Sequence, residues 1–221
     1  MKRWMTAFAV FAIVAAIAAS TLGRTYALYY DATEGHGTAI VLTNLVDEET
    51  TAKVFTYASS GEELAAVEAL LAPFASKAIF VEDHLGASTG RTWGLARVET
   101  PGRIAVATWL RDEHGWLTIE NASAPYGLPG ETEYSGYWMT ANYANTENRM
   151  TALSLINPSD HPAAGEIYFY DAAGESVSVR PFELEPRDAA FVLLRDELDV
   201  GETMWGMIDV RTDRPLLLVT E

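Results

Sequence analysis

The chain has 221 residues, of which 49% are hydrophobic and 21% charged, a composition that can bury a core and excludes a wholly disordered protein. With 15 Lys and Arg against 31 Asp and Glu, the net charge of -16 repels phosphate and argues against general nucleic-acid binding. The absence of cysteine excludes disulfides, thiolate metal sites, cysteine nucleophiles and a lipid-modified cysteine anchor.

Residues 1–23 have the pattern of a membrane segment. Lys2 and Arg3 precede an uncharged run from Trp4 to Gly23. A spanning helix needs about 20 apolar residues, whereas the apolar region of a cleaved signal peptide has about 7–15. The length favours a retained single-pass transmembrane anchor in the inner (cytoplasmic) membrane, with the positively charged N-terminus in the cytoplasm and the bulk of the chain periplasmic. Cleavage remains an alternative, since Ala16-Ile17-Ala18 is an acceptable small-x-small site.

Two features of this segment predict its surroundings. Small residues recur at every fourth position, which lets a second membrane helix approach closely. The two stripes are Ala12, Ala16, Ser20 and Ala15, Ala19, Gly23. Aromatic residues at the two ends of the segment are expected at the membrane interface, and these are Trp4, Tyr26, Tyr29 and Tyr30. The predicted partners are therefore the lipid bilayer and integral membrane protein subunits.

The remainder of the chain repeats itself. Residues 38–62 and 151–175 align at a constant shift of 113 with eight identities in twenty-five positions, among them Asn44 with Asn157. After one dropped residue, Trp93-Gly94 meets Trp205-Gly206. A period of this length fits a domain of ordinary size rather than a solenoid repeat. The sequence predicts an internal duplication, with one copy at 24–121, a linker rich in proline and glycine at 122–135, and a second copy at 136–221.

Short strands parted by turn residues predict an all-β fold of antiparallel β-sandwiches. Glu62–Leu71 has helical composition, but its counterpart Ser176–Leu184 contains Pro181 and β-branched residues, so the repeat favours a strand in both copies. The first copy continues as a hairpin, 104–110 and 116–120. The strands expected in the second copy are 151–156, 165–170, 176–179, 182–184, 189–194, 204–210 and 216–220.

Three turn elements of the second copy carry a family likeness. They are Leu-x-Asn-Pro-Ser-Asp at 155–160, Tyr-Asp-x-x-Gly at 170–174 and Leu-x-Pro at 184–186. Through them the chain resembles the immunoglobulin-like or fibronectin-type β-sandwich modules strung along bacterial envelope proteins. The resemblance covers residues 24–221 and implies two tandem immunoglobulin-like sandwiches, without implying an activity.

Three patterns in the sequence are candidates for chemistry. Gly86-Ala87-Ser88-Thr89-Gly90 matches the G-x-S-x-G pattern of serine hydrolases, but it lies in a loop between predicted strands instead of on a strand-to-helix elbow. Asp47-Glu48-Glu49 could hold calcium through oxygen ligands, yet it lacks an EF-hand loop. Each of the four histidines has a neighbouring acid but no metal-ligand spacing: His36, His84, His114 and His161. We therefore expect no catalytic residues, no metal and no cofactor.

Aromatic residues supply the candidates for partner contact. Trp93 and Trp205 each precede a glycine at the start of the same repeated strand and are predicted to fill the core, with a sugar platform as the alternative. Aromatic residues that the repeated fold does not need are predicted to contact a partner. These are Trp109, Trp116, Tyr126, Tyr134, Tyr137 and Trp138.

These features predict a non-catalytic, single-pass accessory or scaffold subunit that braces the periplasmic face of a bacterial membrane complex, photosynthetic or respiratory. The alternative is a secreted or tethered envelope module that recognises glycan or protein. A third hypothesis is an enzyme with Ser88 as its nucleophile. A fourth is that the acidic surface steers a basic soluble periplasmic protein, such as a small electron carrier.

Overall fold

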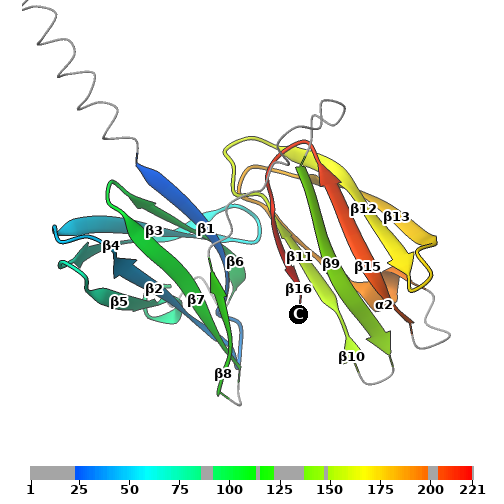
Figure 1. The fold of residues 1–221 in the computed structure, drawn as a ribbon, viewed down its shortest axis with the longest axis horizontal. Helices are drawn as coiled ribbons and strands as arrows, with labels where there is room; N and C mark the ends of the chain where they lie inside the picture. The colour runs from blue at the N-terminus through cyan, green and yellow to red at the C-terminus, as the bar shows by residue number, and fades with distance from the viewer. Residues whose placement is uncertain are drawn as a thin grey trace, which may run out of the picture.

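The computed structural model describes residues 23–85, 92–112, 115–121, 137–146, 149–198 and 204–220. Over these residues the protein is all-β and consists of antiparallel sheets arranged as two sandwiches side by side (Figure 1). Within them, no helix has the length and apolar character that crossing a bilayer requires. The predicted anchor, with Trp4 and every residue of the two small-residue stripes except Gly23, lies outside the described residues.

The first sandwich has two four-stranded sheets. We call one its front sheet, and its strands in spatial order are β1 (Arg24–Asp31), β6 (Trp93–Thr100), β3 (Thr50–Ala58) and β4 (Glu63–Leu71). The other is its back sheet, with β5 (Ser76–Phe80), β2 (Gly37–Asn44), β7 (Ile104–Asp112) and β8 (Gly115–Asn121). A 3-10 turn, η1 (Val81–Asp83), follows β5.

The second sandwich has the same layers. Its front sheet contains β10 (Arg149–Met150), β9 (Tyr137–Thr146), β15 (Met204–Thr212), β12 (Ala163–Asp171) and β13 (Ser176–Leu184). Its back sheet contains β14 (Ala189–Leu193), β11 (Ala152–Ile156) and β16 (Leu217–Thr220), and a single helical turn, α2 (Leu194–Glu197), follows β14.

The strand bounds of the two sandwiches correspond. Adding 113 to the bounds of β3, β4 and β5 gives those of β12, β13 and β14. The strand expected at Glu62–Leu71 is confirmed as β4, which pairs with β3 from Leu71 to Glu63. Its helical composition is overridden because tertiary context regularly outweighs intrinsic propensity. The predicted hairpin is confirmed as β7 and β8.

Each sandwich encloses its own core between its two sheets. Period-2 alternation sends every second side chain inward, so Val54, Val98 and Leu42 meet in the first core. Ile167, Val210 and Leu155 form the equivalent part of the second core.

A buried asparagine ties the loops at one end of each sandwich. The Asn44 Nδ2 amide donates to the carbonyl oxygens of Glu48, Leu71 and Ala72 at 2.7, 3.3 and 3.1 Å. The Asn157 Nδ2 amide donates to the oxygens exactly one repeat later, those of His161, Leu184 and Glu185, at 2.8, 3.4 and 2.9 Å. Both asparagines are almost fully buried. The identical residues of the repeat therefore hold identical turns.

Candidate protein-binding interface

The two sandwiches are joined by a third buried cluster, which we call the joint. Tyr29, Tyr57 and Leu95 from the outer face of the first front sheet pack against residues of the second back sheet, namely Ile156, Leu217 and Val219. All six side chains are between 0% and 8% exposed. The joint is thus as dry as the two cores, and the sandwiches form one continuous packed body.

Strand alternation explains how these residues reach the joint. In β6, Ala96 and Val98 point into the first core, so Leu95 on the opposite face points outward. In β11, Leu153 and Leu155 enter the second core, which leaves Ile156 on the outer face. One sandwich contributes its front sheet and the other its back sheet.

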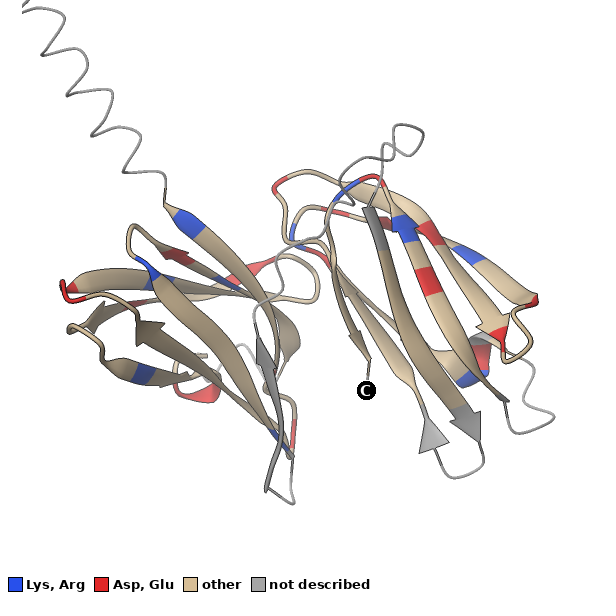
Figure 2. Ribbon diagram, viewed as in Figure 1, with Lys and Arg blue, Asp and Glu red and all other residues tan. Residues whose placement is uncertain are grey.

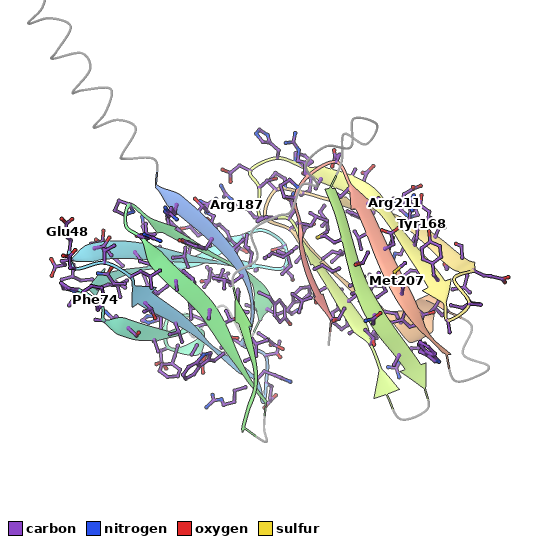
Figure 3. All side chains as sticks on the ribbon, viewed as in Figure 1. Glu48, Phe74, Tyr168, Arg187, Met207 and Arg211 are labelled. Carbon is purple, nitrogen blue, oxygen red and sulfur yellow. The ribbon has the colours of Figure 1, made fainter. Side chains whose placement is uncertain are left out.

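A polar network centred on Asp160 closes one side of the joint. The Asp160 Oδ1 atom accepts from Arg97 Nη1 of the first sandwich at 3.2 Å and from Arg187 Nη2 of its own sandwich at 2.6 Å. The Arg187 guanidinium, whose residue is labelled in Figure 3, also lies 5.0 Å from the centre of the Tyr57 ring, across the joint. The hydrogen bond from Arg187, with the charges of both arginines, holds the pKa of Asp160 below its ordinary value.

Backbone contacts add to this side of the joint. The Ala189 N–H donates to the Ser59 carbonyl at 2.8 Å. Ser60 and Asp188 form an isolated antiparallel bridge. Gly61, in the β3–β4 turn, has a φ of +78°. The turn between two strands of one sandwich is therefore hydrogen-bonded to the loop that precedes β14 of the other.

The joint also buries polar atoms without hydrogen-bond partners among the described residues. The Tyr57 hydroxyl and the Ser154 hydroxyl are two of them. Burial raises the pKa of Tyr57, while the nearby charges of Arg97 and Arg187 act in the lowering direction. An unpaired buried hydroxyl costs about 1–3 kcal/mol, so the apolar contacts and the Asp160 network carry the stability of the joint.

The second front sheet presents an aromatic surface to solvent. We call it the exposed front face, made of Tyr168, Tyr170, Trp205, Met207 and Arg211. The Tyr168 and Tyr170 rings stack with centroids 6.4 Å apart and planes at 15°, and the Arg211 guanidinium lies 4.3 Å from the Tyr168 ring centre. Trp205 is 63% exposed and Met207 39%. Figure 3 labels Tyr168, Met207 and Arg211 on this sandwich.

An acidic side chain lies within the exposed front face. Asp209 is 1% exposed, and its Oδ2 atom accepts from Arg211 Nη2 at 2.9 Å and Nε at 3.1 Å. Its Oδ1 atom is buried and has no hydrogen-bond partner among the described residues. Arg211 therefore neutralises the carboxylate while one acceptor oxygen is left over.

The exposed front face is the counterpart of the front face that the joint covers. Tyr168 and Tyr170 stand where the first sandwich has Phe55 and Tyr57, whose rings are also 6.4 Å apart, with planes at 22°. At the shift of 112 that applies to β15, Trp205 replaces Trp93 and Met207 replaces Leu95. The same kind of face is thus covered in one sandwich and exposed in the other.

The first back sheet presents an uncharged surface, which we call the exposed back face. Three cross-strand rows form it, and the β-ladders print them as Phe80–Ala39–Trp109, Ala78–Val41–Ala107 and Ser76–Thr43–Ala105. Phe80 and Trp109 are each 40% exposed, while Ala39 between them is 1% exposed and Val41, Thr43 and Ala107 are half-buried. In a chain with 21% charged residues, nine neighbouring positions without a charge are a notable surface. Figure 2 shows the middle of β2 and β7 free of acidic and basic residues.

The structure corrects two sequence predictions. Tyr29 and Tyr30 were expected at the membrane interface together with Tyr26, but β1 already begins at Arg24 and carries all three into the first sandwich. Tyr29 packs in the joint, Tyr30 is fully buried and donates from its hydroxyl to the Tyr57 carbonyl at 3.0 Å, and Tyr26 donates to the Ile104 carbonyl at 2.9 Å. These tyrosines are packing residues.

The prediction that Trp93 and Trp205 fill the core is wrong as well. Both point away from their own core, because the inward positions of β15 are those of Ile208 and Val210. Trp93 packs at the joint, 6.3 Å from the Tyr29 ring and 6.1 Å from the Phe191 ring, whereas Trp205 is exposed. The glycine that follows is the residue that needs space, since a Cβ at Gly94 would lie 2.3 Å from the Tyr57 oxygen.

The predicted partner-contact residues fall in different places. Trp109 lies on the exposed back face, where its role in partner contact stays a prediction. Trp116 is in β8, and Tyr137 and Trp138 begin β9 opposite Thr212 and Arg211; their side chains are outside the described part. Tyr126 and Tyr134 lie outside the described residues altogether.

The joint itself is absent from the sequence predictions. A signal was present in the differences between the copies, because Ile156, Leu217 and Val219 stand where the first copy has Thr43, Ala105 and Ala107. Large apolar residues on an outward strand position in one copy only mark a surface that a neighbour covers.

The chemical candidates have local structural roles or lie outside the described segments. Ser88 and His114 are not described. The Glu48 carbonyl accepts from Asn44, which makes the Asp47–Glu49 segment part of a tied turn. The His36 ring lies 3.3 Å from the Thr33 hydroxyl in an exposed turn. Within the described ranges, no group of three or more His, Asp and Glu residues is placed to hold a metal ion.

No protein-family model and no curated protein matches this chain. Among solved structures, the PBSX exported protein XepA is similar over 86% of this chain and 81% of its own, with 11% sequence identity and a TM-score of 0.24. At that score the likeness carries no argument, and the function has to be inferred from the surfaces described above.

Proposed function

We propose that this protein is a non-catalytic scaffold subunit of a bacterial membrane complex. In this proposal, residues 1–23 anchor it, and two immunoglobulin-like sandwiches that arose by duplication brace the periplasmic face of the complex. The joint carries the proposal, because it turns two small domains into one stiff body. A brace needs that stiffness, since domains connected only by a linker move relative to each other by default.

The two exposed faces supply places at which a scaffold can dock. Exposed apolar or aromatic surface marks contact sites on soluble domains, and interfaces are enriched in Tyr, Trp, Met and Arg. The exposed front face contains all four of these residue types. Met207 is 39% exposed, and a glutamate in its place would bring an unpaired charge into the contact, which is costly to bury. One substitution there is therefore enough to weaken a complex measurably.

Copurification in mild detergent tests the scaffold role. The full chain with an affinity tag should retain the same membrane subunits in every preparation, and Met207→Glu or Val41→Glu should reduce that retention at least tenfold. Leu70→Glu is the matched control, because Leu70 is 56% exposed on β4, outside both exposed faces. A chain that runs alone under all mild conditions would rule the proposal out.

A second candidate is an envelope module that binds glycan. The aromatic pair Tyr168–Tyr170 favours it, since sugars stack on aromatic rings. It is tested by cosedimentation with purified cell-wall glycan. Binding that survives Tyr168→Ala and Tyr170→Ala, or no binding by the wild type, would exclude this candidate.

A further inference from the structure

We infer that the exposed front face of one copy binds the exposed back face of another, so that the protein assembles head to tail through a second use of its own interdomain contact. The inference deepens the proposed scaffold function, on which it rests, by naming a partner: a second copy of the chain.

The joint is asymmetric. It pairs the front sheet of the first sandwich with the back sheet of the second (Figure 1). The second front sheet and the first back sheet are left outside this contact. Apart from β8 in the first back sheet and β10 in the second front sheet, the strands of the two sandwiches follow the same order. The two remaining faces therefore correspond to the two that already fit together within the chain.

The covered front face of the first sandwich resembles the exposed front face of the second. Where the covered front face has Phe55, Tyr57, Trp93 and Leu95, the exposed one has Tyr168, Tyr170, Trp205 and Met207. The stacked ring pair is kept, and a cation lies over its first ring in both, Lys53 at 4.7 Å and Arg211 at 4.3 Å. The exposed front face therefore keeps the aromatic positions of β3 and β6, while Asn142 stands at the position of the joint residue Tyr29.

The two back faces differ in the size of their side chains. In the joint, Ile156, Leu217 and Val219 fill the surface, and their counterparts on the exposed back face are Thr43, Ala105 and Ala107. The side chains of the exposed back face are smaller than those that the second back sheet contributes to the joint. They are also uncharged. Met207 is longer than the Leu95 it replaces, and Trp205 projects with 63% of its surface exposed. Larger side chains on one face thus meet smaller ones on the other.

The loops that precede β5 and β14 also correspond. Arg187, which lies over Tyr57 in the joint, has a φ of +65°, and its counterpart Phe74 has a φ of +55°. The shared left-handed backbone points to the same turn, and Phe74 is 67% exposed. It lies at the end of the first sandwich that faces away from the second (Figure 3). Between copies, Phe74 takes the place of Arg187 and would meet Tyr170.

The charges make the contact between copies weaker than the joint. The Arg97–Asp160 pair has Asp209 and Asp47 as its counterparts, and Asp209 is already paired with Arg211. Each chain also carries a net charge of -16. Repulsion therefore opposes an apolar attraction, so salt should strengthen the association, in contrast to an association driven by ion pairs.

A contact between two different faces does not close on itself in a pair. Heterologous contacts generate rings or open filaments, depending on the rotation between neighbours. An open assembly keeps one free face at each of its two ends and grows along one direction, whereas a ring keeps none.

Sedimentation of the full chain in mild detergent tests the inference. The wild type should form species larger than a monomer with increasing concentration, and more of them in about 1 M than in about 0.1 M NaCl, since the Debye length falls from about 10 to about 3 Å. Val41→Glu blocks the back face and Met207→Glu the front face, so each variant alone should stay monomeric. Leu70→Glu should associate like the wild type.

Mixing the two variants is the decisive measurement. Val41→Glu keeps its front face and Met207→Glu keeps its back face, so an equimolar mixture should form a heterodimer and nothing larger. Ala78→Glu and Trp205→Glu serve as second variants if either of the first pair unfolds. Residues 1–23 are unchanged in all of them, so association through that segment would persist in every variant.

Two results would overturn the inference. One is a wild type that stays monomeric at all concentrations and salt levels. The other is a wild type that associates while the mixed variants remain separate, because the two faces then do not bind each other. Either result leaves copurification with membrane subunits unaffected, so the scaffold proposal stands or falls on its own experiment.

Discussion

Gly61 and Pro186 lie backbone to backbone across the joint: a Cβ on Gly61 would stand 2.6 Å from the Pro186 carbonyl oxygen. Gly174, one repeat later, has nearly the same φ, +83° against +78°, but a Cβ there would meet nothing within 4 Å. The two glycines share a turn conformation, but only Gly61 has another segment packed against it.

Alanine variants of these two glycines measure how strongly the contact across the joint constrains the protein. Gly174→Ala should cost about 1–2 kcal/mol of unfolding free energy, the cost of a left-handed alanine. Gly61→Ala should cost that amount and about 1–3 kcal/mol more, because the new methyl group overpacks the joint. Urea unfolding of both variants gives the difference. Equal losses would mean that the contact between Gly61 and Pro186 does not constrain the protein in solution.

Two tyrosines should respond to loss of the hydroxyl in opposite ways. Tyr30→Phe removes a buried hydrogen bond to the Tyr57 carbonyl and should destabilise the protein by about 1 kcal/mol. Tyr57→Phe removes a buried hydroxyl that has no hydrogen-bond partner among the described residues, and stability should stay equal or rise. Thermal unfolding by calorimetry separates the two. A clear loss in Tyr57→Phe would show that this hydroxyl is hydrogen-bonded in solution.

The Asp160 network should make the joint sensitive to acid. Its pKa is lowered in the folded protein, so its contribution is complete above the unfolded value of about 3.9 and is lost as the pH falls through the lower folded value. The free energy of unfolding measured in urea should therefore fall by no more than about 1 kcal/mol below about pH 4, because the Asp160 side chain is 61% exposed and water screens its ion pairs.

Asp160→Asn is the matched variant for that experiment. It cannot form the ion pairs with Arg97 and Arg187, so its free energy of unfolding should lack the acid step of the wild type. Asp213→Asn is the control, since the Asp213 carboxylate accepts from the Ala164 N–H within the second sandwich. A wild-type acid step that persists unchanged in Asp160→Asn would assign the sensitivity to other carboxylates.

Asn44 and Asn157 should contribute equally to the free energy of unfolding. Asn44→Ala and Asn157→Ala each leave three buried or half-buried carbonyl oxygens without their amide donor, and each should cost about 2–3 kcal/mol. Thr43→Ala, whose hydroxyl makes an exposed contact with Ser76, should change stability by less than about 0.5 kcal/mol. Unfolding curves that show a large loss for only one asparagine would contradict the equivalence of the two turns.

The fold was predictable where local chemistry decides it. Turn residues such as Gly61 and Gly174 and the alternation along each strand are properties of short segments, and the repeat added independent support for β4 against its helical composition. The surfaces were not predictable in the same way. Period-2 alternation separates the two faces of a strand but does not say which face a second domain covers.

Trp93 and Trp205 show this limit clearly. They are the same residue at the same repeat position, followed by the same glycine, yet one packs at the joint and the other is 63% exposed. The difference between them arises from a neighbouring domain and cannot be found in their own strand. Likewise, Tyr29 and Tyr30 follow a hydrophobic segment in sequence, but the strand that contains them belongs to the sandwich.

The position of β16 in the joint has a consequence for biosynthesis. Synthesis proceeds from the N-terminus, so Tyr29, Tyr57 and Leu95 exist as a folded surface before Leu217 and Val219 have been made. During that interval the aromatic surface of the first sandwich is in water, and the strand that covers it comes from the same chain only if no other chain supplies one first. Nascent neighbours on one messenger are therefore positioned to exchange sandwiches, and slow emergence of the second domain would favour intertwined dimers over correctly closed monomers.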